Sequence, residues 1–212
     1  MPLETVPHGP FRIRQPLALA SASPRRQALL ASLGIHFLVV PSWVPEPPRL
    51  AEEVPVDYAL RLARLKAGDM AARFQDHLVL GADTMVVADD IVLGKPGSPA
   101  AALEALRLLR GREHEVITGV WLMRAADQVD EGFHAVSTVR MASFTDDVLA
   151  AYVRSGEPMD KAGSYAIQGG GGFLVRSVTG SVSNVVGLPL QETAAALLRL
   201  GVVAPAEGGE GA

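Results

Sequence analysis

The chain has 212 residues, a net charge of −4 and no cysteine, and 49% of its residues are hydrophobic. This length predicts one or two domains with a sizeable buried core. The acidic balance argues against a protein that binds nucleic acid or a membrane surface, and the missing cysteines exclude disulfides, thiolate nucleophiles and Cys-ligated zinc. The composition suits the reducing cytoplasm, which is the location we expect, and no apolar window approaches the length of a membrane-spanning helix.

Composition divides the chain into three parts. Residues 1–15 hold three prolines and little periodicity, so we expect a loose N-terminal arm. Residues 16–203 contain no repeat and no long linker, and they are interpreted as one domain. Residues 204–212 are rich in Gly and Glu, which predicts a disordered tail.

In chain order, the elements expected in the first half are a strand at 16–20, a helix at 24–33, a strand followed by a proline-rich loop at 35–45, and a helix at 56–74. Ser23 as N-cap and Pro24 at the first helical position form a strong helix-start signal. The apolar stripe of the second helix carries Lys66 at its edge.

In the second half we expect strands at 78–82 and 85–88, a hairpin turn at 89–90 into a strand at 91–93, a helix at 98–110, strands at 115–124 and 133–144, a helix from Thr145 to Gly156, a polar loop at 157–172, a strand pair at 172–186 and a last helix at 189–200. Strands and helices are interleaved along the chain. This order predicts the α/β class.

The turn Ser21-Ala22-Ser23-Pro24-Arg25-Arg26 joins a strand end to a helix N-terminus. Free backbone N–H groups and two arginines at such a place favour a bound anion, phosphate above all. An ordinary capped helix with solvated arginines explains the same residues, so both interpretations stay open.

Asp83 follows an apolar strand in Gly81-Ala82-Asp83-Thr84. Ligands of α/β sheets gather at the carboxyl ends of strands, where this carboxylate could hold Mg²⁺ or activate a water molecule. The alternative is a turn aspartate that caps its own backbone.

Only three of the 19 basic residues are lysine, and they are Lys66, Lys95 and Lys161. A lysine retained in an arginine-rich chain can mark a place that needs a compact ammonium. Lys95 lies in a Gly-Lys-Pro loop, and Lys161 lies in a polar, glycine-terminated loop with Gln168 that suggests close approach to a ligand. Solvated surface turns are the alternative for both loops. The five histidines lack metal-ligand spacing, and none is assigned to a metal.

Taken together and in order, the stretches SASPRR, GADT, LGKP, LRGREHEVITGV, YAIQGGGG and GSVSNVVGLPL resemble the Maf family of nucleoside triphosphate pyrophosphatases. The resemblance runs from about residue 17 to residue 190. It implies a mixed α/β fold with two lobes around a central cleft, related to the inosine triphosphate pyrophosphatases. It also implies hydrolysis of a nucleoside triphosphate to the monophosphate and pyrophosphate, with dTTP and UTP, or modified pyrimidine nucleotides, as substrates.

The resemblance implies a role for each candidate residue. These are Asp83 as the catalytic carboxylate, Asp83 and Glu46 as ligands of Mg²⁺ (or Mn²⁺), Arg25, Thr84 and Gln168 as specificity positions, and Ser21, Arg26, Lys66, Lys95 and Lys161 as phosphate-binding residues. A homodimer is compatible with the family. Two alternatives stay open, namely a non-catalytic nucleotide-binding regulator linked to cell division and a 7-methyl-GTP pyrophosphatase.

Overall fold

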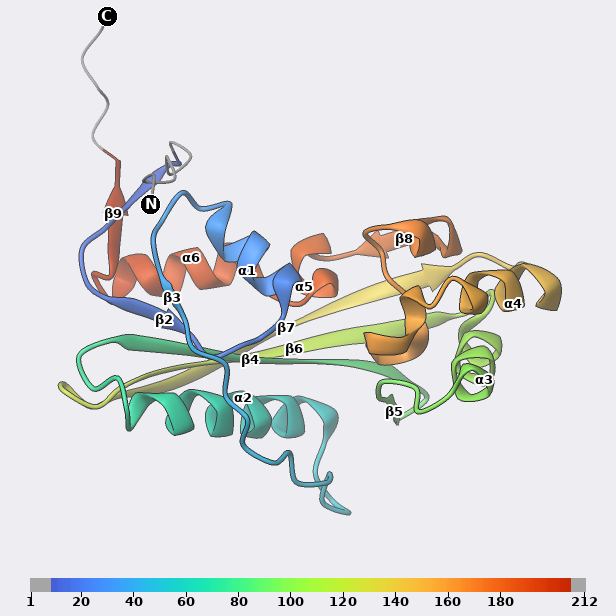
Figure 1. Ribbon diagram of the computed structural model, residues 1–212, viewed down its shortest axis with the longest axis horizontal. Coiled ribbons are helices and arrows are strands. Elements are labelled where there is room, and N and C mark those ends of the chain that lie inside the picture. Colours follow the sequence, from blue (N-terminus) through green and yellow to red (C-terminus); the bar gives the residue numbers. More distant parts are fainter. Residues whose placement is uncertain (1–8, 207–212) are drawn as a thin grey trace, which may run out of the picture.

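A seven-stranded mixed sheet runs through the molecule, and its long central strands extend from one end to the other in the computed structural model, which describes residues 9–206 (Figure 1). Its strands are β2 (Leu17–Leu19), β3 (Leu38–Val39), β4 (Leu78–Ala88), β5 (Ile91–Leu93), β6 (Glu113–Arg124), β7 (Val129–Met141) and β8 (Val175–Thr179). The strand order is β3-β2-β4-β6-β7-β8, and β5 pairs with β4. Strand β2 runs parallel to β3 and β4, whereas the other pairs are antiparallel.

Helices cover both faces of this sheet. They are α1 (Pro24–Ala31), α2 (Pro55–Ala71), α3 (Pro99–Leu109), α4 (Asp146–Arg154), α5 (Val182–Val186) and α6 (Leu190–Arg199). Helix α2 lies on one face, α1, α5 and α6 lie on the other, and α3 and α4 gather at one end (Figure 1). None of the helices within residues 9–206 is long and apolar enough to cross a membrane.

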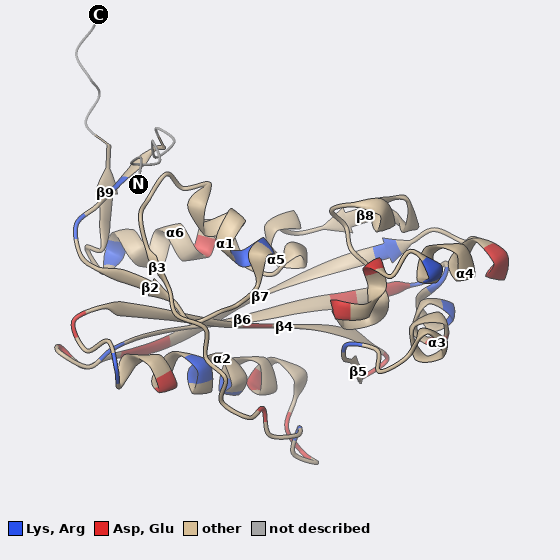
Figure 2. Cartoon of the chain, in the orientation of Figure 1, with Lys and Arg blue, Asp and Glu red and all other residues tan. Residues whose placement is uncertain are grey.

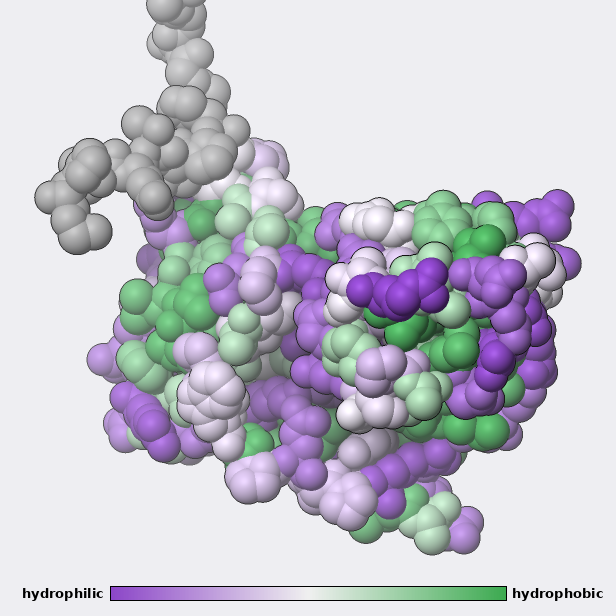
Figure 3. Space-filling model, turned by 45° about the vertical axis from the view of Figure 1, so that its right-hand side comes forward, coloured by the Kyte–Doolittle hydropathy of each residue, from purple (hydrophilic) through white to green (hydrophobic). Residues whose placement is uncertain are grey.

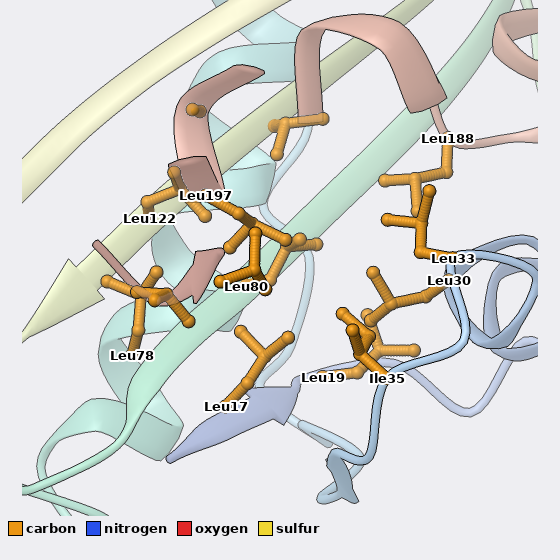
Figure 4. Close-up of a cluster of buried hydrophobic side chains, with 14 of the residues drawn as sticks. Leu17, Leu19, Leu30, Leu33, Ile35, Leu78, Leu80, Leu122, Leu188 and Leu197 are labelled. Carbon is orange, nitrogen blue, oxygen red and sulfur yellow. The ribbon is translucent and has the colours of Figure 1, made fainter. Parts of the chain in front are cut away.

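Of the four buried hydrophobic clusters among the described residues, two define the two lobes. The first core joins β2, α1 and α6 through leucines such as Leu19, Leu30 and Leu197 (Figure 4). The second core joins α3 and α4 to the far ends of β4, β6 and β7 through residues such as Leu106 and Val139. The α/β prediction with a mixed sheet and two lobes is therefore confirmed.

Two glycines bring α2 close to the sheet. A Cβ atom on Gly81 of β4 would lie 2.3 Å from the carbonyl oxygen of Ala63, and one on Gly119 of β6 would lie 2.6 Å from the carbonyl carbon of Ala59. Because no side chain intervenes, the helix backbone packs directly against the two strands. This close contact fixes the height of α2 above β4.

Residues at helix starts and in the hairpin turn predicted the local backbone structure correctly. Ser23 caps α1 and Ser98 caps α3, each accepting a hydrogen bond from a backbone N–H of the first turn. Asp89 and Asp90 both have positive φ, which gives the tight hairpin between β4 and β5 that their sequence predicts.

The prediction of a break in the strand at Asp83 is wrong, because β4 continues through it to Ala88. What ends there is the neighbouring strand. Strand β2 pairs with residues 78–80 of β4 and β5 pairs with residues 86–88, so within the described chain residues 81–85 have no strand partner along that edge. The gap leaves the middle of a long strand without a strand partner, where the sequence suggested a strand end.

Two other segments differ from expectation. The predicted strand pair at 172–186 is the strand β8 followed by the helix α5, which Ser181 caps. The polar loop at 157–172 contains three short 3₁₀ turns, η1 (Glu157–Asp160), η2 (Ala162–Ser164) and η3 (Gly170–Leu174).

The ends of the domain also pair with each other. Strand β1 (Phe11–Ile13) pairs antiparallel with β9 (Val203–Pro205), so the expected arm and tail are ordered at these positions. The rest of the predicted tail, 207–212, and the first part of the arm, 1–8, lie outside the described residues.

Candidate active site

A cleft of about 280 Å³ lies between the two lobes, over the unpaired edge of β4. The surface between the lobes is largely hydrophilic (Figure 3). The charged residues that line the cleft are Arg25, Arg26, Glu46, Lys66, Asp83, Lys95, Asp160 and Lys161. Cationic side chains outnumber anionic ones there by five to three, although the whole chain is acidic. The cleft is thus a local site for an anion.

Asp83 and Lys66 form the centre of the cleft. Lys66 Nζ on α2 lies 2.6 Å from Asp83 Oδ1 on β4, and each side chain is 13% exposed. The same ammonium lies 2.7 Å from Glu46 Oε1, whose side chain is 53% exposed. One lysine therefore holds two carboxylates that come from distant parts of the chain. Figure 2 shows basic positions on both α1 and α2, two of the helices that contribute cationic side chains to the cleft.

The loop that carries Glu46 is attached to one side of α2. Tyr58 Oη donates to the carbonyl oxygen of Pro47 at 3.1 Å. Arg61 forms a bidentate pair with Glu53 at 2.6 and 2.7 Å, which ties down the end of the same loop. These contacts position Glu46 although no helix or strand includes it. Burial favours the neutral form of Glu46, but the hydrogen bond and charge of Lys66 outweigh it and lower the pKa.

Arg26 is fixed against the floor of the cleft. Its Nε donates to the carbonyl oxygen of Gly187 at 2.8 Å, and its Nη2 donates to Thr84 Oγ1 at 3.0 Å. Burial lowers the pKa of the Arg26 guanidinium, and the negative charge of Asp83 opposes this shift. The guanidinium is therefore preorganised before a ligand arrives.

Ser21 is not part of the cleft lining. Its side chain is buried at 7% exposure, and its Oγ accepts hydrogen bonds from Ser23 N–H and from Arg26 Nη1. The structure thus places Ser21 behind Arg26, as a support for the arginine, whereas the sequence had suggested direct contact with phosphate. Ser23 lines the cleft in its place.

Arg25 connects the two lobes. Its Nη1 lies 3.2 Å from Asp160 Oδ2 in the η1 turn, and Lys161 Nζ lies 2.6 Å from Asp160 Oδ1. Burial favours the neutral carboxyl of Asp160, but hydrogen bonds from Lys161 and Arg25 outweigh it and lower the pKa. A phosphate in the cleft would compete with Asp160 for these two cations.

Lys95 and Gln168 are the predicted residues with open polar groups. Both line the cleft, both are exposed, and neither forms a hydrogen bond or ion pair with the described residues. Lys95 is close enough to help lower the pKa of Glu46. Gln168 follows Tyr165, Ala166 and Ile167 along the wall formed by the lobe of α3 and α4.

The donor set fits a magnesium ion that arrives with its ligand. Among the described residues, no group of three or more His, Cys, Asp or Glu side chains converges on one point. Asp83 and Glu46 nevertheless offer two carboxylates that share one ammonium. Mg²⁺ is commonly held by one or two carboxylates, with substrate phosphates and water completing its ligands.

The structure brings together in one cleft every predicted site residue except Ser21. The sequence prediction missed Tyr58, which also lines the cleft and whose pKa is raised by burial and by the nearby charges of Asp83 and Glu46. Its position eight residues before Lys66 places both side chains on one face of α2, so helical periodicity could have indicated it.

Comparison with known proteins agrees with this geometry. The dTTP/UTP pyrophosphatase of Nitratidesulfovibrio vulgaris is 47% identical over 195 residues, which is 92% of each chain. The dTTP/UTP pyrophosphatase of Moorella thermoacetica is 47% identical over 88% of this chain and 95% of its own length. A solved nucleoside-triphosphatase / dITP/XTP pyrophosphatase from Mycobacterium abscessus is similar over 86% of this chain and 94% of that chain, with 15% identity and a TM-score of 0.42, which supports no functional inference. The Maf-like protein family matches residues 16–200, and this chain belongs to that family.

Proposed function

We propose that this chain hydrolyses dTTP and UTP between the α and β phosphates, releasing the nucleoside monophosphate and pyrophosphate. The observation that carries the proposal is the cleft in which Asp83 lies among cationic side chains from α1, α2, the loop after β5 and the turns after α4. The family and the names of the relatives support the same activity.

The cationic side chains bind the triphosphate and stabilise the charge that develops on the leaving pyrophosphate. Arg26 is held in place by Gly187 and Thr84, so its guanidinium does not need to reorganise during the reaction. Lys95 has open donors for a phosphate oxygen. Arg25 and Lys161 become available when phosphate replaces Asp160 as their partner.

Asp83 is the general base of the proposed reaction. A water molecule attacks the α phosphorus, and the bond from this phosphorus to the bridging α–β oxygen breaks, so that pyrophosphate leaves. Asp83 takes the proton that the water loses. Lys66 keeps the carboxylate in position through the 2.6 Å contact. A Mg²⁺ ion held by Asp83 and Glu46, or Mn²⁺ in its place, would supply charge neutralisation at the phosphate oxygens.

Gln168 is the proposed reader of the pyrimidine base. Uracil and thymine present a carbonyl acceptor next to an N–H donor, and the side-chain amide presents the complementary donor and acceptor. A good bidentate match to a base is worth about 1–3 kcal/mol of discrimination. The amide makes no hydrogen bond to the described residues, so it is available to a ligand.

Product analysis tests the proposal. The purified protein is incubated with UTP, dTTP, CTP or GTP in the presence of Mg²⁺, and nucleotides and phosphates are separated by ion-exchange chromatography. We expect UMP and pyrophosphate in equal amounts from UTP, and release of orthophosphate instead would contradict α–β cleavage. Tight UTP binding without product would favour a nucleotide-binding regulator, and faster cleavage of 7-methyl-GTP would favour that specificity.

A further inference from the structure

A buried histidine lies behind the cleft wall and has no part in the proposed chemistry. His114 on β6 is 3% exposed, and its Nε2 lies 2.7 Å from Tyr165 Oη. The two rings meet edge to face, with their centroids 5.4 Å apart. The Nδ1 atom of His114 is buried without a hydrogen-bond partner among the described residues. The core of this lobe therefore contains a polar pair where two apolar side chains would fill the same space.

Tyr165 begins the wall segment that leads to Gln168. Tyr165 and the three residues after it, Ala166, Ile167 and Gln168, are among the residues that line the cleft. Just before it, Gly163 and Ser164 both have positive φ, at +67° and +61°. Neither a helix nor a strand of the sheet includes residues 165–168. The conformation of this segment is therefore not imposed by a regular hydrogen-bonding ladder.

Two buried side chains hold the segment instead. His114 bonds to the hydroxyl of Tyr165, and Tyr152 Oη on α4 accepts a hydrogen bond from Ala166 N–H at 3.2 Å. Burial lowers the pKa of His114 to about 4, so the imidazole is neutral at physiological pH. Burial also raises the pKa of the Tyr165 hydroxyl, which stays protonated. A neutral imidazole and a protonated hydroxyl can form one hydrogen bond, in which the imidazole tautomer decides which group donates.

We propose that His114 is a positioning residue for pyrimidine recognition, and that its hydrogen bond to Tyr165 fixes the segment that presents the Gln168 amide to the base. The inference rests on the proposed role of Gln168 in the cleft. An amide can turn over to suit cytosine as well as uracil, so discrimination between these bases requires a fixed presentation. Loss of the buried bond lets the segment move and reduces discrimination before it reduces phosphate chemistry.

The test compares kcat and KM for UTP and CTP in the wild type, His114→Phe and Tyr165→Phe. Both substitutions keep an aromatic ring and remove the hydrogen bond. We expect the ratio of kcat/KM for UTP to kcat/KM for CTP to fall about tenfold. This fall should arise from a change in KM, and kcat for CTP should stay at the wild-type value. The double variant should show the same ratio as either single variant, because all three lack the same bond.

Leu197→Ala is the matched control, because Leu197 is fully buried in the core of the other lobe. It should lower the thermal midpoint and leave the UTP to CTP ratio unchanged. An unchanged ratio in His114→Phe and Tyr165→Phe, or an equal loss on both nucleotides, overturns the inference. A wild type with no preference for UTP would instead overturn the proposed base recognition itself. If His114→Phe does not fold, Tyr165→Phe alone decides the question.

Discussion

Burial of His114 makes the stability of the protein depend on pH between its ordinary pKa of 6.5 and its pKa of about 4 in the folded protein. The pKa of His114 is about 4 in the folded protein because burial disfavours the imidazolium, against an ordinary value of 6.5. As the pH falls below 6.5, the unfolded chain binds a proton that the folded chain refuses, so stability falls. Each pKa unit corresponds to about 1.4 kcal/mol, so the loss is about 2 kcal/mol at pH 5 and about 3 kcal/mol below pH 4.

The comparison of wild type with His114→Phe isolates this contribution from other groups that titrate. At pH 7 the variant should be less stable, because the buried Tyr165 hydroxyl loses its partner at a cost of about 1–3 kcal/mol. Urea unfolding at pH 7 and pH 5 gives the free energy of unfolding of both proteins. The difference between them should shift by about 2 kcal/mol in favour of the variant at pH 5. An identical difference at both pH values would refute the assignment of a neutral buried histidine.

Two further substitutions test the site and its support. Gln168→Glu should weaken the use of UTP and dTTP selectively, since a carboxylate lacks the amide donor. Steady-state kinetics with a purine triphosphate as reference measures this effect. An equal loss of activity on all nucleotides would contradict base recognition. Gly119→Ala should destabilise the protein by about 1–3 kcal/mol in urea unfolding, because the added Cβ would lie 2.6 Å from the backbone of Ala59. The substitution should also reduce turnover, because α2 positions Lys66 beside Asp83. A variant as stable as the wild type would contradict the expectation, because it would show that α2 can move away from β6 without a cost in free energy.

Short-range chemistry made much of the fold predictable. Ser23 with Pro24, Ser98 with Pro99, and the pair Asp89-Asp90 each specify a backbone geometry by themselves, and the structure has those geometries. The sequence after Gly180 contains a similar signal that the prediction passed over. Ser181 accepts a hydrogen bond from Asn184 N–H and starts a helix within the segment that was predicted as a strand pair.

Contacts between residues far apart in the sequence could not be predicted from local sequence patterns. Asp83 looked like the end of a strand because a carboxylate has no packing value inside one. The structure gives it a partner, Lys66, from a helix that approaches through two glycines. Pairing between the chain ends, β1 with β9, depends on contacts across almost the whole sequence. Motif order nonetheless brought most of the cleft residues together, because the motifs contribute element ends, loops and, with GADT, the unpaired middle of β4 to the cleft.

The same limit explains the placement of Ser21. Its position in the SASPRR turn suggested a phosphate ligand, since hydroxyls and backbone N–H groups gather at a helix start. Its hydroxyl instead accepts a hydrogen bond from Arg26, and the arginine reaches Thr84 and Gly187. Which member of a polar turn faces the ligand depends on where its neighbours are anchored, and those anchors come from residues more than fifty positions away.

The rate of pyrophosphate release by Asp83→Asn, measured beside the wild type with UTP and Mg²⁺, tests the central claim most directly. The substitution keeps the size of the side chain and removes the carboxylate that would accept the proton. The cleft geometry predicts a loss of about a hundredfold or more in kcat, with circular dichroism and the thermal midpoint showing a folded protein. Pyrophosphate release at the wild-type rate by the folded variant would contradict a catalytic role for Asp83.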